Sequence, residues 1–375
     1  MTFSSGSKCL YDVLLIADPH VHPFQAFGRV GPGGVHSRVA STLEAMEKAF
    51  QYAKDNKIKH VVLLGDIFHG KGVVRGGVFN LVYRFLKKWS ECISTITVIP
   101  GNHDLDAEYG GESVLEPLSS IVTVVRPEEG AWVGLHNDSD PNKYFPVLTA
   151  YVPWGASIPS EEVLRQWSAS VRICFAHAAV NGAVVGLGEH CPKTQLSVSD
   201  FDPFTLSFLG HYHKHQALGG GRVVYVGSLL GQSFSDAGKV GGFVRLRVVA
   251  DGDNYQPEWE FIPTAAPRFI VVEEKAPGSF SYPHYAANCY VRYDGERSEE
   301  EEQVRKAYLD AGALGIVFKW ADRTKDFKPR IQMDVGRDTS VPLQQYIELM
   351  NTSLDANRLL ALGRDIMDTV DNRRV

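Results

Sequence analysis

Apolar and polar positions follow two regular patterns along the first hundred residues. Short apolar runs at 12–17, 60–64 and 95–99 are typical of buried strands, and each is followed by a polar cluster. Between them, apolar residues recur at helical spacing over 37–55 and again from Val78 to Trp89. This order of strands and helices predicts an α/β layered sheet. Further short strands are expected at 171–176, 205–209, 222–226 and 242–249.

Composition narrows the class of protein. The 375 residues, 44% hydrophobic and 22% charged, suit a globular chain with one large domain and one or two small ones. No apolar run reaches about 18 residues and the first ten residues lack a secretory signal, so we expect no membrane association. Five scattered cysteines without a CxxC motif favour reduced thiols and a cytoplasmic protein. The net charge of −6 counts against an extended nucleic-acid surface but allows a local basic one.

Side chains able to bind metals stand at the ends of five expected strands. They are Asp18 and His20, Asp66, Asn102 and His103, His177, and His211 and His213. The loops beyond the carboxyl ends of strands build the site in open α/β sheets. A lone histidine in such a place is more often structural, but five coincidences favour a metal site. Nitrogen and oxygen donors without thiolates suit manganese, iron or zinc better than an all-oxygen magnesium site.

The motifs at these positions resemble those of the calcineurin-like metallophosphoesterases. The matching segments, in order, are Asp18-Pro-His20, Gly65-Asp66-Ile-Phe-His69, Gly101-Asn102-His103-Asp104, Ala176-His177 and Gly210-His211-Tyr-His213. The segment Gly227-Ser-Leu-Leu-Gly-Gln-Ser-Phe234 is similar to one in the SbcD-type recombination and repair nucleases. That group includes bacterial SbcD, its bacteriophage equivalents and the eukaryotic double-strand-break nuclease.

The resemblance implies a fold, a domain order and a set of ligands. The fold is a layered β-sandwich flanked by helices, with a small α+β capping domain and a C-terminal helical pair. The implied domains are a nuclease domain at 1–265, a capping domain that shapes DNA access at 268–338, and a partner-docking segment at 340–375. The first metal is held by Asp18, His20, Asp66 and His213. The second is held by Asp66, Asn102, His177 and His211, so Asp66 bridges.

The resemblance also implies the chemistry. Two divalent ions, preferably Mn2+ and alternatively Mg2+, activate a water and bind the phosphoryl oxygens. His103 stabilises the transition state or protonates the leaving oxygen, and Asp104 orients its ring. His69 faces the substrate. The activity expected is hydrolysis of DNA, as an exonuclease or endonuclease.

Three other functions fit the sequence less well than a DNA nuclease does. A phosphoprotein phosphatase of this superfamily carries an Asp-Arg pair after the second motif and Glu after Asn-His, whereas this chain has His69-Gly70 and Asp104. A cyclic-nucleotide or small-molecule phosphodiesterase of this fold typically ends soon after the last histidine motif, whereas this chain continues from His213 to Val375. A non-catalytic scaffold loses ligands, and here all the expected ligands are present.

The tail suggests contacts with DNA and with a partner. After a linker-like stretch at 263–267, we expect a strand at Cys289–Tyr293, a helix opening at Ser298 and a strand at Gly315–Trp320. A basic strip there offers three candidate DNA contacts, Lys325, Lys328 and Arg330. Two amphipathic helices in 340–375 either pack on the chain's own core or, as the resemblance implies, dock on an SbcC-type ABC ATPase. The resemblance also implies a homodimer.

Three positions near the motifs are ambiguous. The glycine-rich stretch 28–34 predicts a loop beside the site, with Arg29 and Arg38 as possible phosphate contacts. His22 and His215 each lie two residues beyond an expected ligand. Neither matches a ligand position of the resembled family, so both are expected to be structural.

Overall fold

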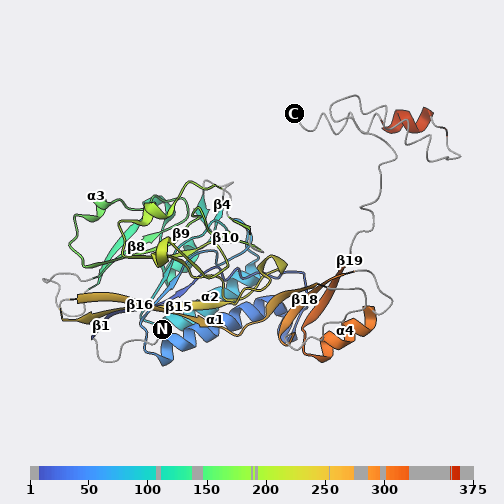
Figure 1. Cartoon of the computed structure of the whole chain (residues 1–375), viewed down its shortest axis with the longest axis horizontal. Helices are drawn as coiled ribbons and strands as arrows, with labels where there is room; N and C mark the ends of the chain where they lie inside the picture. Colours follow the sequence, from blue (N-terminus) through green and yellow to red (C-terminus); the bar gives the residue numbers. More distant parts are fainter. Residues whose placement is uncertain are drawn as a thin grey trace. The chain divides into compact units, whose positions relative to one another are not determined.

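The computed structural model describes residues 8–106, 111–136, 147–186, 189–190, 193–252, 254–273, 286–295, 301–320, 355 and 357–363 (Figure 1). It divides into two units, Met1–Trp320 and Ala321–Val375. The expected α/β class is confirmed: two large sheets and a few helices form the first unit.

The first sheet has six strands in the order β16-β15-β1-β2-β3-β6. Their bounds are β1 (Lys8–Ile16), β2 (His60–Leu63), β3 (Thr95–Val98), β6 (Thr123–Val124), β15 (Gly242–Asp251) and β16 (Asn254–Pro263). The strands β1, β2, β3 and β6 run parallel, and β15 and β16 are antiparallel additions at one edge. Ile16 pairs with Leu63 and Leu63 with Val98, so the carboxyl ends of three neighbouring strands are aligned.

The second sheet also has six strands, in the order β13-β14-β12-β9-β8-β7. Their bounds are β7 (Trp132–His136), β8 (Val147–Val152), β9 (Val171–His177), β12 (Leu206–Gly210), β13 (Gln216–Leu218) and β14 (Val223–Tyr225). The central strands β8, β9, β12 and β14 are parallel. Gly210 pairs with His177, so β9 and β12 also end side by side.

Alternate side chains of β1 explain how the layers stack. Val13 and Leu15 are fully buried between the two sheets, where they share a core with Phe175 of β9. Leu14 and Ile16 point the other way, into a core shared with the helices α1 (Ser37–Asp55) and α2 (Gly76–Ser90). Because both faces of β1 are covered there, residues 13–16 form a continuous apolar run. Figure 1 shows α1 and α2 along one side of the first sheet and β8 and β9 on the other.

A smaller sheet follows the sandwich. Its strands are β17 (Arg268–Glu273), β18 (Cys289–Gly295) and β19 (Gly315–Trp320), parallel and in that order. Together with α4 (Glu301–Asp310) it encloses its own core, which includes Val291, Tyr308 and Ile316. The remaining short elements are α3 (Glu161–Leu164), β4 (Leu105–Asp106), β5 (Glu112–Ser113), β10 (Val184–Val185), β11 (Glu189–His190) and 3-10 turns at Pro32–Gly34, Glu116–Ser120, Pro127–Glu129, Val198–Phe201, Gly219–Gly221 and Phe234–Asp236.

Most predicted elements occur within one or two residues of their expected bounds, but several strands were not predicted, four of them five or more residues long. The helix predicted at 37–55 is α1 without any shift. Those four longer strands are β7, β8, β16 and β17, and the others are strands of two or three residues. The sequence of β16, which contains Pro257 and several polar residues, fits an edge strand better than a buried one, and it pairs with β15 alone.

The linker expected at 263–267 is anchored to the sandwich. Thr264 is 4% exposed, and its hydroxyl donates to the carbonyl of Leu229 at 2.6 Å. In the tail, residues 357–363 are helical, within the second predicted helix. The rest of that helix and all of the first lie outside the described residues. In the part of the chain that the structure describes, no helix combines the length and apolar character needed to cross a membrane.

Candidate metal centre

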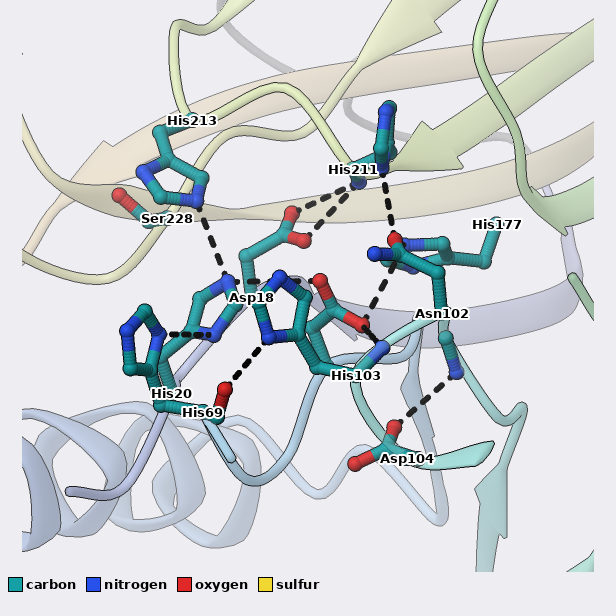
Figure 2. A network of polar contacts seen from close by, with 12 residues as sticks. Asp18, His20, His69, Asn102, His103, Asp104, His177, His211, His213 and Ser228 are labelled. Carbon is teal, nitrogen blue, oxygen red and sulfur yellow. Dashed lines mark hydrogen bonds and ion pairs between the residues drawn. The ribbon is translucent and has the colours of Figure 1, made fainter. Parts of the chain in front are cut away.

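The predicted ligands meet where the parallel strands of both sheets end. Asp18, Asp66 and Asn102 follow β1, β2 and β3. His177 is the last residue of β9, and His211 comes directly after β12. Figure 2 shows His20, His69 and His213 on one side of this cluster and Asn102, His177 and His211 on the other.

The backbone at the site is unusual. Asp18, His20, Asp66 and His211 all have positive φ angles, of 49°, 44°, 52° and 104°. This left-handed conformation costs a residue other than glycine about 1 kcal/mol or more, and such strain concentrates at functional sites. At Gly101 a Cβ would lie only 2.2 Å from Oδ1 of Asp66. Glycine is therefore required there because the chain passes directly against the carboxylate.

Apart from a group of His20, His69 and His103, the candidate donors in the described residues form two close groups. In one group, the ligand atoms of Asp18, His20 and His213 all lie within 4.8 Å of one another. In the other, the same holds for Asp66, His177 and His211. Oδ2 of Asp66 lies 3.4 Å from Nε2 of His20, whereas Oδ1 lies 3.5 Å from Nε2 of His177. Asp66 therefore presents a different oxygen to each group.

Asn102 belongs to the second group. Its Oδ1 lies 3.2 Å from Nε2 of His177 and 2.9 Å from Nδ1 of His211. In the first group, Nε2 of His20 and Nε2 of His213 approach to 3.2 Å. An ion held at about 2.1 Å by two donors at a right angle keeps them about 3.0 Å apart, so these separations suit shared cations.

Burial favours the neutral forms of Asp18 and of three histidines at the site. Asp18 is fully buried, and this burial, together with the charge of Asp66, raises its pKa well above its usual range. Burial lowers the pKa of His20 and of His177, and it lowers that of His211 to about 3. Neutral imidazoles keep a lone pair for a metal, and divalent cations would relieve the repulsion between the carboxylates. The donor set therefore fits two divalent ions.

Asp236 is a site residue that the sequence analysis missed. Its two oxygens lie 3.1 and 3.2 Å from Nδ1 of His213, and it also accepts a bond from Lys239 at 2.7 Å. Burial acts to raise the pKa of Asp236, but the bond and charge of His213, with Lys239, hold it well below its usual range. A carboxylate bound to Nδ1–H leaves Nε2 free to bind metal. The only sequence signal was its place two residues after Phe234.

His103 and His69 lie beside the first group. The imidazole of His103 contacts the carbonyl oxygen of His69 through Nδ1 at 2.5 Å, and the two rings stack with centroids 5.2 Å apart. Nδ1 of His69 is 3.2 Å from Nδ1 of His20. Burial, followed by the charge of His103, lowers the pKa of His69 to about 4. Both residues therefore lie beside the first donor group, and their roles toward a substrate stay predictions.

The role predicted for Asp104 is corrected. Its buried carboxylate accepts bonds from the backbone N–H groups of Ile67, Phe68 and Gly101 at 3.0–3.2 Å. It thus ties the loop after β2 to the loop after β3. The group that contacts Nδ1 of His103 is the carbonyl of His69 and not Asp104. Burial and the charge of Asp66 raise the pKa of Asp104 to about 8, against the opposing effect of the three amides.

Arg38 is not a phosphate contact. It is 2% exposed, and its guanidinium donates to the carbonyls of Ala26 and Gln232. It also lies over the rings of Phe269 in β17 and Tyr290 in β18, 5.1 Å from each centroid. Arg38 therefore holds the loop before α1 against the smaller sheet.

His215 and His22 make structural contacts. His215 bonds to the carbonyl of Tyr225 and stacks on Phe261 with centroids 4.3 Å apart. His22 packs edge-on against the His69 ring. The predicted DNA contacts Lys325, Lys328 and Arg330 lie outside the described residues.

With this geometry in place, the family is clear. The sequence model of the calcineurin-like phosphoesterases matches residues 11–215, more than half of the chain and all of the strand-end motifs. The chain belongs to the calcineurin-like phosphoesterase family. No curated protein matches it.

Several solved structures are similar at low identity. A dimetal phosphatase from Danio rerio is 12% identical. The match covers 69% of this chain and 100% of the phosphatase, with a TM-score of 0.41. GAP50, the anchor in the inner membrane complex of Plasmodium, is 12% identical, covering 69% and 86%, with a TM-score of 0.43. The nuclease MPE of Pseudomonas putida is 15% identical, covering 62% and 83%, with a TM-score of 0.26. At these values no substrate can be carried over.

Proposed function

We propose that this chain is a two-metal phosphodiesterase whose substrate is DNA, a nuclease subunit of the SbcD type. The observation that carries the two-metal part is the position of Asp66, whose two oxygens face one histidine in each donor group. A carboxylate that presents one oxygen to each of two imidazole groups can bind two divalent cations at once.

The residues of the chain divide the chemistry between them. Asp18, His20, Asp66 and His213 would hold one ion, and Asp66, Asn102, His177 and His211 the other. Two such ions, Mn2+ by preference or Mg2+, would lower the pKa of a water and neutralise phosphoryl oxygens. His103 is fixed through Nδ1 by the His69 carbonyl, so its Nε2 is left to interact with the leaving oxygen.

Two features support a phosphodiester in DNA as the substrate. The segment 227–234, which resembles the SbcD-type nucleases, takes part in the site, because the amide of Gln232 donates to the carbonyl of Asp18 at 3.1 Å. Asp236, two residues beyond this segment, bonds to His213. In addition, Lys71 and Arg75 are exposed on the loop that follows His69. Cationic side chains beside a metal centre suit a chain of phosphates.

The tail belongs to the same proposal. Lys325, Lys328 and Arg330 would contact the DNA backbone, and residues 340–375 would dock on an SbcC-type ABC ATPase. The chain would also form a homodimer. Deleting 340–375 should remove co-purification of the ATPase but leave cleavage of small phosphodiesters intact; aggregation of the shortened chain would count against this role.

A direct assay tests the substrate. End-labelled linear and hairpin DNA would be incubated with the purified chain and Mn2+ or Mg2+, alone and with the ATPase, alongside cyclic nucleotides and a small phosphodiester. We expect metal-dependent DNA cleavage that disappears in the matched Asp66→Asn variant. Hydrolysis of cyclic nucleotides or small diesters without any DNA cleavage would favour the alternative, a small-molecule phosphodiesterase of the same family.

A further inference from the structure

Trp154 lies directly beside the second donor group without being a ligand. Its indole packs against the His211 ring, with centroids 4.9 Å apart and planes tilted by 33°, and against His177 at 5.8 Å. Its backbone N–H donates to the carbonyl of Pro100 at 3.0 Å, two residues before Asn102. An indole offers no lone pair to a metal, and Trp154 remains partly exposed. The ring is therefore held firmly at the edge of the metal centre with part of its surface open.

A hollow of about 1060 Å³ opens beside this ring. Its lining includes four glutamates, Glu112, Glu116, Glu128 and Glu129. Arg126 is the one cationic side chain among its described lining residues, and it is paired with Glu116 and Glu129. Such a hollow repels phosphates but can accept hydrogen bonds from the amino groups of an uncharged ring.

We propose that Trp154 and this hollow form a subsite for a nucleobase of the substrate. The inference rests on the proposed function, because it needs a nucleotide whose phosphate occupies the metal centre. The base next to the scissile phosphate stacks on the open part of the indole, and the glutamates face its polar edge. Base–aromatic stacking tolerates any sequence and contributes about 1–3 kcal/mol per base in single-strand binding proteins, which corresponds to about 5–150-fold in affinity.

The test compares two single-stranded oligonucleotides that differ only in the presence of bases. One carries natural bases, and the other has abasic residues on both sides of the cleaved bond. Trp154→Ala should reduce kcat/KM for the natural strand about tenfold more than for the abasic strand, mainly through KM. Trp154→Phe should restore most of the wild-type preference for the natural strand.

The control is Trp132→Phe, in β7, which should keep the wild-type ratio of kcat/KM between the two strands. An equal loss on both strands, or loss of bound Mn2+ in Trp154→Ala, would show that Trp154 only supports His211 and would overturn the subsite.

A binding measurement separates this inference from the function on which it rests. Mn2+-loaded protein should bind dAMP at least about tenfold more tightly than deoxyribose 5-phosphate, and Trp154→Ala should remove the difference. Equal affinity for the two ligands overturns the subsite, whether or not DNA is cleaved. Tighter dAMP binding through Trp154, combined with no cleavage of any oligonucleotide, supports the subsite and overturns the nuclease.

Discussion

The backbone N–H of His103 donates to Oδ1 of Asp66 at 2.8 Å, the same oxygen that lies 3.5 Å from His177. His103 thus supports the proposed bridging carboxylate through its main chain and keeps its side chain for another task. Replacing the side chain leaves this bond in place.

His103→Ala should therefore separate turnover from metal binding. We expect kcat to fall about 100- to 10,000-fold, the usual contribution of a general acid, while two metal ions per chain remain. Elemental analysis and steady-state kinetics on the same preparation give both values. Loss of an ion in this variant would make His103 a ligand and its proposed role wrong.

Asp66→Asn tests the bridge. The carboxylate is 2% exposed and close to Asp18, so the neutral amide should leave the metal-free fold as stable as before or slightly more stable. Hydrolysis should fall to background because the amide cannot offer two anionic oxygens to two ions. Thermal unfolding and nuclease assays check both points. Residual activity within about tenfold of wild type would contradict the two-metal assignment.

The donor groups could be predicted from the sequence because they stand in short motifs just after apolar runs. Strand ends are local features, and the parallel order of the strands brings them to one edge. Asp236 and Trp154 could not be found in this way, since their contacts with His213 and His211 depend on how distant loops fold back. Arg38 was misjudged for the same reason: the rings that cover it, Phe269 and Tyr290, come from strands far along the chain.

Asp236→Asn should weaken metal binding without removing any ligand. The amide can still occupy the space beside Nδ1 of His213, but it loses the charge that strengthens this hydrogen bond and the pair with Lys239. Losing such an outer partner typically costs 10- to 100-fold in metal affinity. Mn2+ titration of the metal-free protein measures the change. The neighbouring Ser235→Ala is the control, and equal affinity in both variants would argue against the role of Asp236.

Stability of the metal-free protein should depend on pH with a maximum near neutrality. His211 and His69 have folded pKa values of about 3 and 4, below the value of about 6.5 in the unfolded chain. The unfolded state therefore binds more protons, and the stability that these neutral histidines contribute above pH ~6.5 is lost as the pH falls toward 4.

Asp104 acts in the opposite direction. Its folded pKa of about 8 exceeds that of an unfolded aspartate, so its contribution is full at low pH and is lost as the pH rises through about 8. Denaturant unfolding from pH 4 to 9, after chelation, should show stability falling on both sides of about pH 6–7. Adding Mn2+ should flatten the alkaline side, because cations stabilise the charged carboxylates. A steady rise from pH 5 to 9 without metal would contradict the burial of Asp104.

Gly315 in β19 tests how the smaller sheet is held. A Cβ there would lie 2.5 Å from Cδ1 of Phe27, whose ring stacks on Tyr290 of β18 with centroids 4.8 Å apart. Phe27 itself has a φ of 57°, a left-handed conformation that is uncommon for residues other than glycine. Gly315→Ala should cost about 1–3 kcal/mol in unfolding free energy, the usual penalty for overpacking, and speed proteolysis between the sandwich and the smaller sheet. The control on the same strand is Val317→Ala. The side chain of Val317 is 40% exposed, so this variant should change the unfolding free energy little.

Adding Phe27→Ala to Gly315→Ala should bring back part of the loss, because it removes the clashing ring. Strictly additive losses in this double-mutant cycle would mean that the two residues do not meet.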